Sequence, residues 1–364
     1  MNLEVCQNLF VSLAIRSTVL VAMIWLGLKL SARRSASFRC ALLTTGMVGL
    51  ALLPLSWCLP RVEVPFLPAM SSPLAMAAGE SLTVVNQGWI GSLMAIWFLG
   101  MGVLALGQSV GIWQLRRWRD RSVTLDSGYW RGLVTEVSTT LDYRGQVSLF
   151  RCPMIQSPAA AGLFRPCVFL PEEASTWEAE RLRIVLLHEI GHLKRRDLWT
   201  QWLSQSVCAL YWFHPLVWML NRSLHQTREF ACDHAVLSSG TDPSHYAKHL
   251  LALAKNFSQR SDTPRLAMAN GLYLAMASPN TRQSALEQRV RAILSYRGSR
   301  KLSLLLGALW VSCGLTAAWA TATLAPAHRE LAWPSDGGMQ AEPAMVHEPL
   351  ETHLRVTADP FPGN

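Results

Sequence analysis

The chain has 364 residues and a formal net charge of +9, from 33 Lys and Arg against 24 Asp and Glu. Half of its residues are hydrophobic, only 16% are charged, and 15 are Trp. Length alone would allow two or three soluble domains, but this hydrophobicity and low charge content exclude a set of ordinary soluble domains. The composition indicates a membrane protein.

Four apolar stretches are each long enough to cross a bilayer, which needs about 20 mostly apolar residues. They cover residues 9–30, 41–59, 89–113 and 302–324. The flank before the first stretch contains Glu4 and no Lys or Arg, and the stretch is longer than the apolar core of a signal peptide. We therefore expect the first stretch to remain in the protein as a transmembrane helix.

Basic residues beside these stretches predict the orientation of the chain, because cytoplasmic loops carry an excess of Lys and Arg. They cluster between the first two stretches, after the third and before the fourth: Lys29, Arg33, Arg34, Arg39; Arg116, Arg117, Arg119, Arg121; Arg297, Arg300, Lys301. We predict a multi-pass protein of the cell inner (plasma) membrane with both termini outside and residues 116–301 in the cytoplasm. Its basic surplus indicates attraction to the inner leaflet or a surface for an acidic partner, and we expect no direct nucleic-acid binding.

Residues 116–301 predict one α+β domain inserted between the third and fourth stretches. Short apolar runs at 146–150 and 167–170, bounded by Pro and Gly, predict strands. From Thr176 the periodicity becomes helical, and further helices are expected at 199–222, around Glu229, and at 245–255 and 285–294. The cysteines of this block are expected to be reduced packing residues: Cys152, Cys167, Cys208 and Cys232.

The sequence His188-Glu189-Ile190-Gly191-His192 matches the H-E-x-x-H pattern of hydrolytic zinc sites. On a helix, positions i and i+4 share one face, so the two imidazoles can bind the same zinc ion. Glu189 can then reach a water molecule at the metal as general base. The motif predicts His188 and His192 as metal ligands and Glu189 as the catalytic residue.

A catalytic zinc ion usually has three protein ligands and one open position. The stretch from Glu229 to Asp233 supplies two carboxylates at i and i+4, which lie on one helix face. We predict Glu229 as the third ligand and Asp233 as the acceptor for the second ring N–H of a ligand histidine. The alternative is an ordinary acidic face of a helix.

Three further positions have weaker signals. Asp197, just past the motif, either orients a residue of the site or caps the basic turn Lys194–Arg196, whose cations we expect to face solvent or lipid headgroups. His225, one helical turn before Glu229, is a candidate to stabilise the oxyanion of the tetrahedral intermediate. The alternative for His225 is a polar helix position without a catalytic role, and His214 is interpreted as structural.

Residues 199–220 are apolar enough to suggest one more membrane crossing. A single crossing would leave Glu229 about 30 Å from His192, on the other side of the bilayer, where no common zinc site could form. We therefore predict that this segment lies on the membrane surface or enters the membrane and returns. His214-Pro215 is the expected bend, since Pro interrupts helical hydrogen bonding.

A series of stretches together resembles the BlaR/MecR family of integral-membrane zinc metallopeptidases: 157–166, 168–171, 188–197, 211–218, 229–233, 236–237 and 286–290. The resemblance implies a predominantly α membrane protein with four transmembrane helices and a cytoplasmic zincin-like (gluzincin) protease domain between the third and fourth. It implies one zinc ion on His188, His192 and Glu229, with Glu189 as base. It also implies that residues 157–171 contain the strand along which a substrate peptide aligns.

Well-known members of that family link the protease to an outer beta-lactam sensor, and their activation leads to loss of a DNA-bound repressor. Here only residues 325–364 follow the fourth predicted span, and their Pro, Gly and acidic content indicates a disordered extracytoplasmic tail. We expect no penicillin-binding domain in this chain and no beta-lactam sensing by the chain itself. A separate sensor protein would be one source of the signal.

These features predict a membrane-embedded zinc metalloendopeptidase that hydrolyses a cytoplasmic or membrane-adjacent protein, such as a transcriptional repressor, in an antirepressor-like signalling role. Two alternatives remain, a membrane-protein quality-control protease and a non-catalytic signalling scaffold. A scaffold has no need of a base, so Glu189 argues against it. The expected partners are the protein substrate and the lipid bilayer, and a homodimer is left open.

Overall fold

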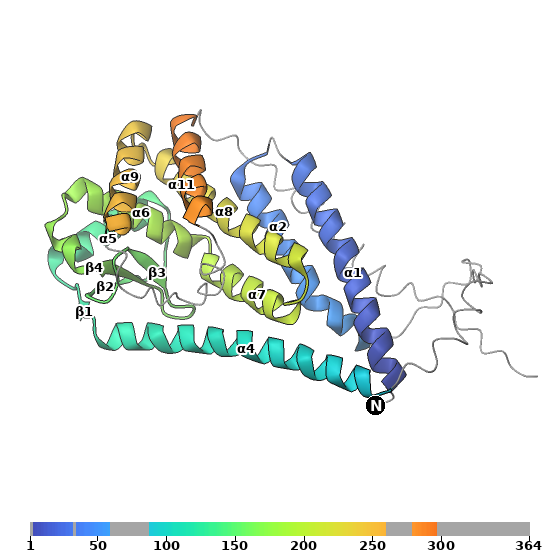
Figure 1. Ribbon diagram of the computed structural model, residues 1–364. Coiled ribbons are helices and arrows are strands. Elements are labelled where there is room, and N and C mark those ends of the chain that lie inside the picture. The colour runs from blue at the N-terminus through green and yellow to red at the C-terminus, as the bar shows by residue number, and fades with distance from the viewer. Residues whose placement is uncertain (1–2, 32–33, 59–86, 260–278, 297–364) are drawn as a thin grey trace, which may run out of the picture.

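The computed structural model describes residues 3–31, 34–58, 87–259 and 279–296. Long apolar helices lie on one side of the molecule, and a small sheet with its covering helices lies on the other (Figure 1). One helix, α4 (Gln87–Asp120), runs along both parts (Figure 1).

Three helices are long and apolar enough to cross a membrane, within Leu13–Leu30, Ala36–Leu55 and Gly91–Asp120. They correspond to α1 (Leu3–Leu30), α2 (Ala36–Leu52) with the short helix η1 (Leu53–Cys58), and α4. The first three predicted stretches are therefore confirmed as apolar helices of membrane-spanning length, and the fourth, at 302–324, lies outside the described residues.

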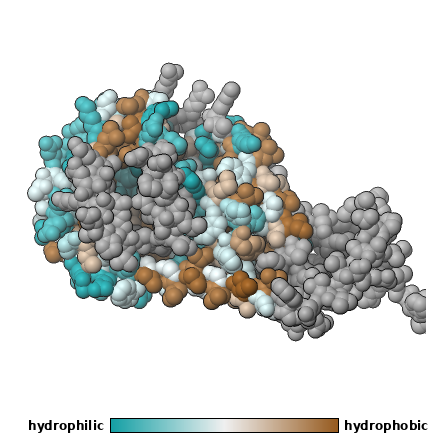
Figure 2. All heavy atoms as spheres, viewed as in Figure 1, coloured by the Kyte–Doolittle hydropathy of each residue, from teal (hydrophilic) through white to brown (hydrophobic). Residues whose placement is uncertain are grey.

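Two observations explain how these helices pack. On α2, a Cβ added to Gly46 would overlap the Ile24 side chain, so glycine permits the close approach of α1. Along α4, large apolar side chains such as Leu99, Val103 and Leu106 are more than half exposed. Figure 2 shows apolar side chains gathered along the lower edge, where α4 lies. An exposed apolar surface of this length is what a lipid-facing helix presents.

The sheet has four strands in the order β1-β2-β4-β3. Parallel pairing joins β2 (Ser148–Cys152) to β4 (Cys167–Pro171), while β1 (Val123–Thr124) and β3 (Ala159–Ala161) pair antiparallel at the two edges. The two predicted strands are therefore confirmed. The short edge strand β3 has only three residues, and its outer side faces the site described below.

Helices cover this sheet and complete its core. α5 (Gly128–Thr140) and α6 (Ala179–Lys194) pack together, and η2 (Glu172–Thr176) connects β4 to α6. α9 (Pro243–Gln259) and α11 (Pro279–Leu294) lie side by side (Figure 1). The buried side chains of this core include Val137, Leu149, Val168, Leu170, Leu186 and Ile190.

A helical hairpin joins the two parts of the molecule. The helical run predicted at 199–222 is divided into two helices: the chain forms α7 (Asp197–Leu210), turns, and starts α8 (Pro215–Ser238) with Pro at its first position. This break falls at the bend predicted for His214-Pro215. Pro215 suits a helix start because the amide proton it lacks would have no partner there.

The turn of the hairpin is held against each of the three apolar helices. Tyr211, which is fully buried, donates its hydroxyl proton to the Leu50 carbonyl on α2 at 2.9 Å. His214 Nε2 lies 3.0 Å from the Thr18 hydroxyl on α1. Trp97 on α4 donates to the Leu210 carbonyl at 3.1 Å. His214 thus has the structural contacts expected of it, and the hairpin is fixed at one end by the apolar helices.

Candidate metal centre

The H-E-x-x-H motif lies on α6, as its periodicity predicts. Leu182, Val185, Leu186 and Ile190 form the buried face of this helix. The motif histidines lie one turn apart with ring centroids 4.9 Å from each other, and their side chains are 14% (His188) and 16% (His192) exposed. The helix therefore presents two neighbouring imidazoles from a rigid, well-packed element.

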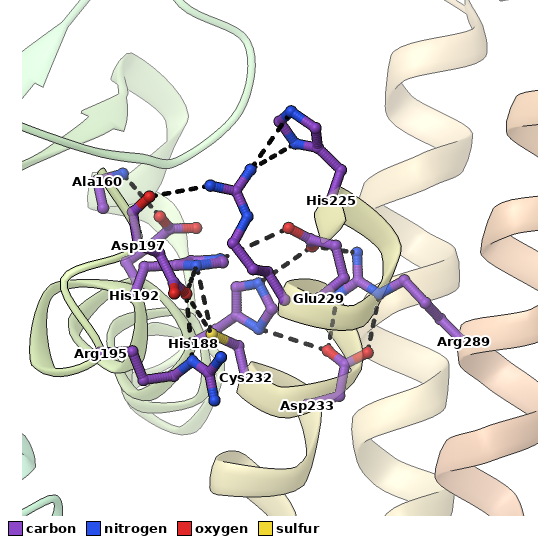
Figure 3. A network of polar contacts seen from close by, with 12 residues as sticks. Ala160, His188, His192, Arg195, Asp197, His225, Glu229, Cys232, Asp233 and Arg289 are labelled. Carbon is purple, nitrogen blue, oxygen red and sulfur yellow. Dashed lines mark hydrogen bonds and ion pairs between the residues drawn. The ribbon is translucent and has the colours of Figure 1, made fainter. Parts of the chain in front are cut away.

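Glu229 comes from α8 and lies opposite both histidines (Figure 3). Its Oε2 is 3.7 Å from His188 Nε2, and its Oε1 is 3.7 Å from His192 Nε2. One ligand atom from each of the three residues falls within 4.8 Å of the others. Atoms arranged tetrahedrally around zinc at 2.0–2.1 Å lie about 3.4 Å apart. The two distances between Glu229 and the imidazoles are within a few tenths of an ångström of this value, and the donor set is one that binds a single zinc ion.

Asp197 binds the outer nitrogen of His192. Its Oδ2 lies 2.9 Å from His192 Nδ1 and accepts a hydrogen bond from Arg195 Nε at 3.3 Å. The sharp connection from α6 to α7 makes this possible, because Arg196 adopts a left-handed backbone conformation (φ 57°) and places Asp197 at the start of α7. Of the two roles predicted for Asp197, the geometry supports orientation of a site residue.

The basic turn Lys194–Arg196 is only partly as predicted. Lys194 and Arg196 are exposed, and Lys194 donates to the Leu141 carbonyl. Arg195 was expected to face solvent or lipid, but its side chain is only 21% exposed and is held by Asp197. Tertiary packing buries Asp197, and a buried carboxylate needs a cation beside it. The sequence pattern alone does not show this burial.

Asp233 lies behind His188, one helical turn beyond Glu229. Its Oδ1 is 3.4 Å from His188 Nδ1, and Arg289 donates to both of its oxygens at 2.7 and 2.8 Å. Tyr246 also donates to Oδ1, at 2.6 Å. The structure thus places Asp233 beside a ligand histidine, as predicted. Tyr246 and Arg289 also contact Asp233, and neither was assigned a role from the sequence; Figure 3 shows Arg289.

Glu189 faces the edge of the sheet. Its Oε2 accepts a hydrogen bond of 2.7 Å from the Ala160 amide on β3. Glu189 and Ala160 both line a cavity of about 440 Å³ that the three candidate ligands also line. The predicted base, the candidate metal ligands and the free edge of β3 therefore share one cavity.

His225 lines the same cavity, near the Arg228 side chain. Arg228 is buried, donates to the Asp197 carbonyl at 2.9 Å and contacts His225 Nδ1. Burial, with Arg228 beside it, lowers the pKa of His225 to about 3. The imidazole is therefore neutral near pH 7, with Nδ1 accepting from Arg228 and its one proton on Nε2.

The charged groups at the centre shift one another's pKa values. Burial opposes ionisation of Glu229, but Arg289, whose Nη1 lies 3.0 Å away, and the two histidines hold the pKa of this carboxyl well below its usual range. Burial likewise disfavours the charged form of His192, but contacts with Cys232 and Asp197 and the Glu229 charge raise its pKa well above the usual value. The pKa of Glu229 is therefore shifted in the direction of the carboxylate, and that of His192 in the direction of the imidazolium.

Cys232 is a packing residue, as predicted, but it also touches the site. Its Sγ lies 3.3 Å from His192 Nδ1 and 3.7 Å from Asp197 Oδ2. Together with these two residues it forms a second set of potential ligand atoms. Because Cys232 lies one helical turn after Glu229 on α8, the sequence could have indicated that it lies near the site.

The remaining histidines of this region are less central. His234 contacts the ring of Tyr296 away from the metal centre. His245 pairs with Glu180 at 2.8 Å and lies 3.0 Å from His249, which reaches the wall of the cavity.

Comparison with known proteins agrees with this site. A family model described as BlaR1 peptidase M56 matches residues 8–293, so the chain belongs to this family of metallopeptidases. Regulatory protein BlaR1 of Bacillus licheniformis is 30% identical over 148 residues, which cover 41% of this chain and 25% of that protein. The methicillin resistance mecR1 proteins of Staphylococcus aureus strain Mu50 and Staphylococcus epidermidis are each 24% identical over 119 residues, 32% of this chain and 20% of theirs. The alignments thus span a quarter or less of the length of these curated relatives.

Proposed function

We propose that this protein is a membrane-embedded zinc metalloendopeptidase. The observation that carries the proposal is the convergence of His188, His192 and Glu229, from two helices far apart in sequence, beside Glu189 in one cavity. Their spacing suits one zinc ion per chain, and the open side of the cavity leaves room for substrate. Membership of a metallopeptidase family supports the same assignment.

Each residue around the ligands has a defined task in this proposal. Asp197 accepts the Nδ1 proton of His192, and Asp233 lies behind His188 with its Oδ1 3.4 Å from Nδ1, so that both Nε2 atoms face Glu229. When bound, zinc supplies Lewis acidity for the scissile carbonyl and the attacking water. Glu189 removes a proton from that water and delivers it to the leaving amine as the peptide bond breaks.

The oxyanion that forms during attack needs a donor. His225 is neutral near pH 7 and carries its proton on Nε2, and it lines the cavity together with Glu189. We assign it the stabilisation of that oxyanion. Arg228, bound to the Asp197 carbonyl, keeps His225 in this protonation state.

The substrate is proposed to be a peptide segment bound along β3. The Ala160 amide points toward the cavity and not toward β4, since it donates to Glu189. An extended peptide beside this edge could add main-chain hydrogen bonds and place its carbonyl near the metal centre. Substrates would therefore be extended segments, not folded helices.

The cavity is proposed to lie at the cytoplasmic face of the plasma membrane. This orientation is supported by Arg117 and Arg119 at the last turn of α4, which mark a cytoplasmic helix end under the positive-inside rule. The α7–α8 hairpin would then enter the membrane layer and return, because its turn contacts α1, α2 and α4. The predicted fourth span, at 302–324, completes this arrangement.

We further propose a regulatory role. Two relatives bear the names Regulatory protein BlaR1 and Methicillin resistance mecR1 protein, and these names favour cleavage of a regulator, such as a transcriptional repressor, over general protein quality control.

Quantitative proteomics of cells that carry the wild type or Glu189→Gln tests this function. Glu189→Gln keeps the three ligands but lacks the base, so cleavage fragments should vanish while zinc content stays the same. Loss of one or a few regulator fragments supports signalling. Loss of fragments from many membrane proteins would support quality control, and an unchanged fragment set would contradict the peptidase role of Glu189.

A further inference from the structure

A buried hydroxyl group lies behind the metal centre, beside the His188 nitrogen that does not face Glu229. It belongs to Tyr246 on α9, a residue that is 3% exposed. The hydroxyl oxygen lies 2.6 Å from Asp233 Oδ1 and 3.2 Å from His188 Nδ1. Three helices meet at this point, because α6 carries His188, α8 carries Asp233 and α9 carries Tyr246.

The donors and acceptors at this point follow from chemistry. A tyrosine hydroxyl has one proton to donate and can also accept, whereas a carboxylate can only accept. The short contact with Asp233 therefore uses the hydroxyl proton, and the oxygen is left as an acceptor toward His188. Both neighbours of His188 Nδ1 are then acceptors, so the ring proton lies on Nδ1. Nε2 keeps its lone pair on the side of Glu229, 3.7 Å away.

Asp233 is fully engaged by other groups. Arg289 on α11 donates from Nε to Oδ2 at 2.8 Å and from Nη2 to Oδ1 at 2.7 Å. Oδ1, which also accepts from Tyr246, lies 3.4 Å from His188 Nδ1, farther than the hydroxyl at 3.2 Å. His192, by contrast, binds its carboxylate directly at 2.9 Å. The hydroxyl thus fills the gap between His188 and its carboxylate.

We propose that Tyr246 is a positioning residue of the metal centre, whose hydroxyl links Asp233 to His188, keeps the His188 proton on Nδ1 and so presents Nε2 to the metal. This inference rests on the proposed role of His188 as a zinc ligand. Groups that orient metal-bound histidines commonly contribute 10- to 100-fold to metal affinity.

Zinc titration of the full-length protein in detergent or nanodiscs, with a competing chelator, tests this role. Tyr246→Phe keeps the buried ring and removes only the hydroxyl, and zinc should bind about 10- to 100-fold more weakly. Tyr211→Phe is the control, because Tyr211 is also buried and its hydroxyl also donates a hydrogen bond, to the Leu50 carbonyl on α2. Both variants lose a buried hydrogen bond, but only Tyr246→Phe should change zinc affinity.

The outcomes separate this inference from the proposed function. If Tyr246→Phe binds zinc as the wild type does while His188→Ala binds it far more weakly, the positioning role is overturned and the zinc site stands. If His188→Ala itself leaves zinc affinity unchanged, the proposed site falls, and the role of Tyr246 falls with it. Equal losses in Tyr246→Phe and Tyr211→Phe would indicate a general effect on folding and would also overturn the positioning role.

A second measurement does not use Tyr246→Phe and so does not depend on whether that variant folds. Nitrogen NMR of the wild-type protein labelled at its histidines reports which ring nitrogen carries the proton. In the zinc-free protein, neutral His188 should carry it on Nδ1, with His188→Gln used to assign the signal. A proton on Nε2 would overturn the proposal.

Discussion

The two histidines of the metal centre are supported by different parts of the molecule. His192 is held by Asp197 at the start of α7, and the far end of α7 contacts the apolar helices through Leu210. His188 is held by Tyr246 and Asp233, which in turn depend on Arg289 of α11. The contacts that hold His192 therefore extend to the apolar helices, and those that hold His188 extend to α9 and α11. A change in either region can alter the same metal site.

The two sides also differ in how their charges are balanced. On the His192 side, one buried carboxylate, Asp197, is shared by His192 and Arg195. On the His188 side, two carboxylates, Glu229 and Asp233, depend on Arg289. Loss of a single guanidinium should therefore be more damaging on the His188 side.

The largest effect is expected for Arg289→Ala in the metal-free protein. Removing this guanidinium, which is 18% exposed, leaves two carboxylates without their main cation, and the free energy of unfolding should fall by roughly 3–5 kcal/mol. Zinc should offset part of this loss, because it neutralises Glu229. Chemical unfolding with and without zinc measures both effects. Arg291→Ala on the same helix is the control, since its exposed pair with Glu287 should contribute about 0–1 kcal/mol.

Arg195→Ala tests the same difference in charge balance between the His188 and His192 sides. It should destabilise the protein less than Arg289→Ala, because Asp197 keeps His192 as a partner. Chemical unfolding of both variants without zinc measures the difference. Equal destabilisation would show that the charges of the two sides are balanced alike, and would contradict this asymmetry between His188 and His192.

A smaller effect is expected from pH. His192 has a pKa raised well above its usual value in the metal-free protein, in which Asp197 is one of its partners, so zinc must displace a proton from it. Zinc affinity should therefore increase as pH rises from about 6 toward the raised pKa of His192, and level off above it. Asp197→Asn removes one cause of the raised pKa, so the rise should occur at lower pH. Zinc titrations at several pH values measure this, and identical pH profiles would contradict the assigned role of Asp197.

Much of the metal centre could be predicted from the sequence, because its core is local. The H-E-x-x-H spacing on one helix identified His188, Glu189 and His192. Asp233 was predicted because it lies four residues after Glu229 in the sequence. The bend at His214-Pro215 was also predictable. A shared zinc site requires Glu229 and His192 to lie on the same side of the membrane, so the apolar segment between them must turn back. The structure has the two carboxylates and both imidazoles together, as the spacing indicated.

Other parts could not be predicted, because they depend on contacts between distant segments. Tyr246 and Arg289 reach the site 58 and 56 residues away from His188 and Asp233, respectively. Arg289 lies in the stretch 286–290 that resembles the family, but the local sequence of neither residue indicates a contact with the metal centre. The short strand β3, with three alanines, lacks the alternation that identifies a strand, so only the family resemblance of residues 157–171 indicated a strand here. Tertiary packing alone gives these residues their roles.

X-ray absorption spectroscopy at the zinc edge tests the central claim most directly, on full-length protein loaded with one equivalent of zinc. We expect two imidazole nitrogens and a carboxylate oxygen at about 2.0–2.1 Å, with no sulfur neighbour. Glu229→Ala should remove the carboxylate contribution, and Cys232→Ser should leave the spectrum unchanged. A sulfur neighbour at about 2.3 Å that disappears in Cys232→Ser would instead put zinc on His192, Asp197 and Cys232, and would contradict the proposed site.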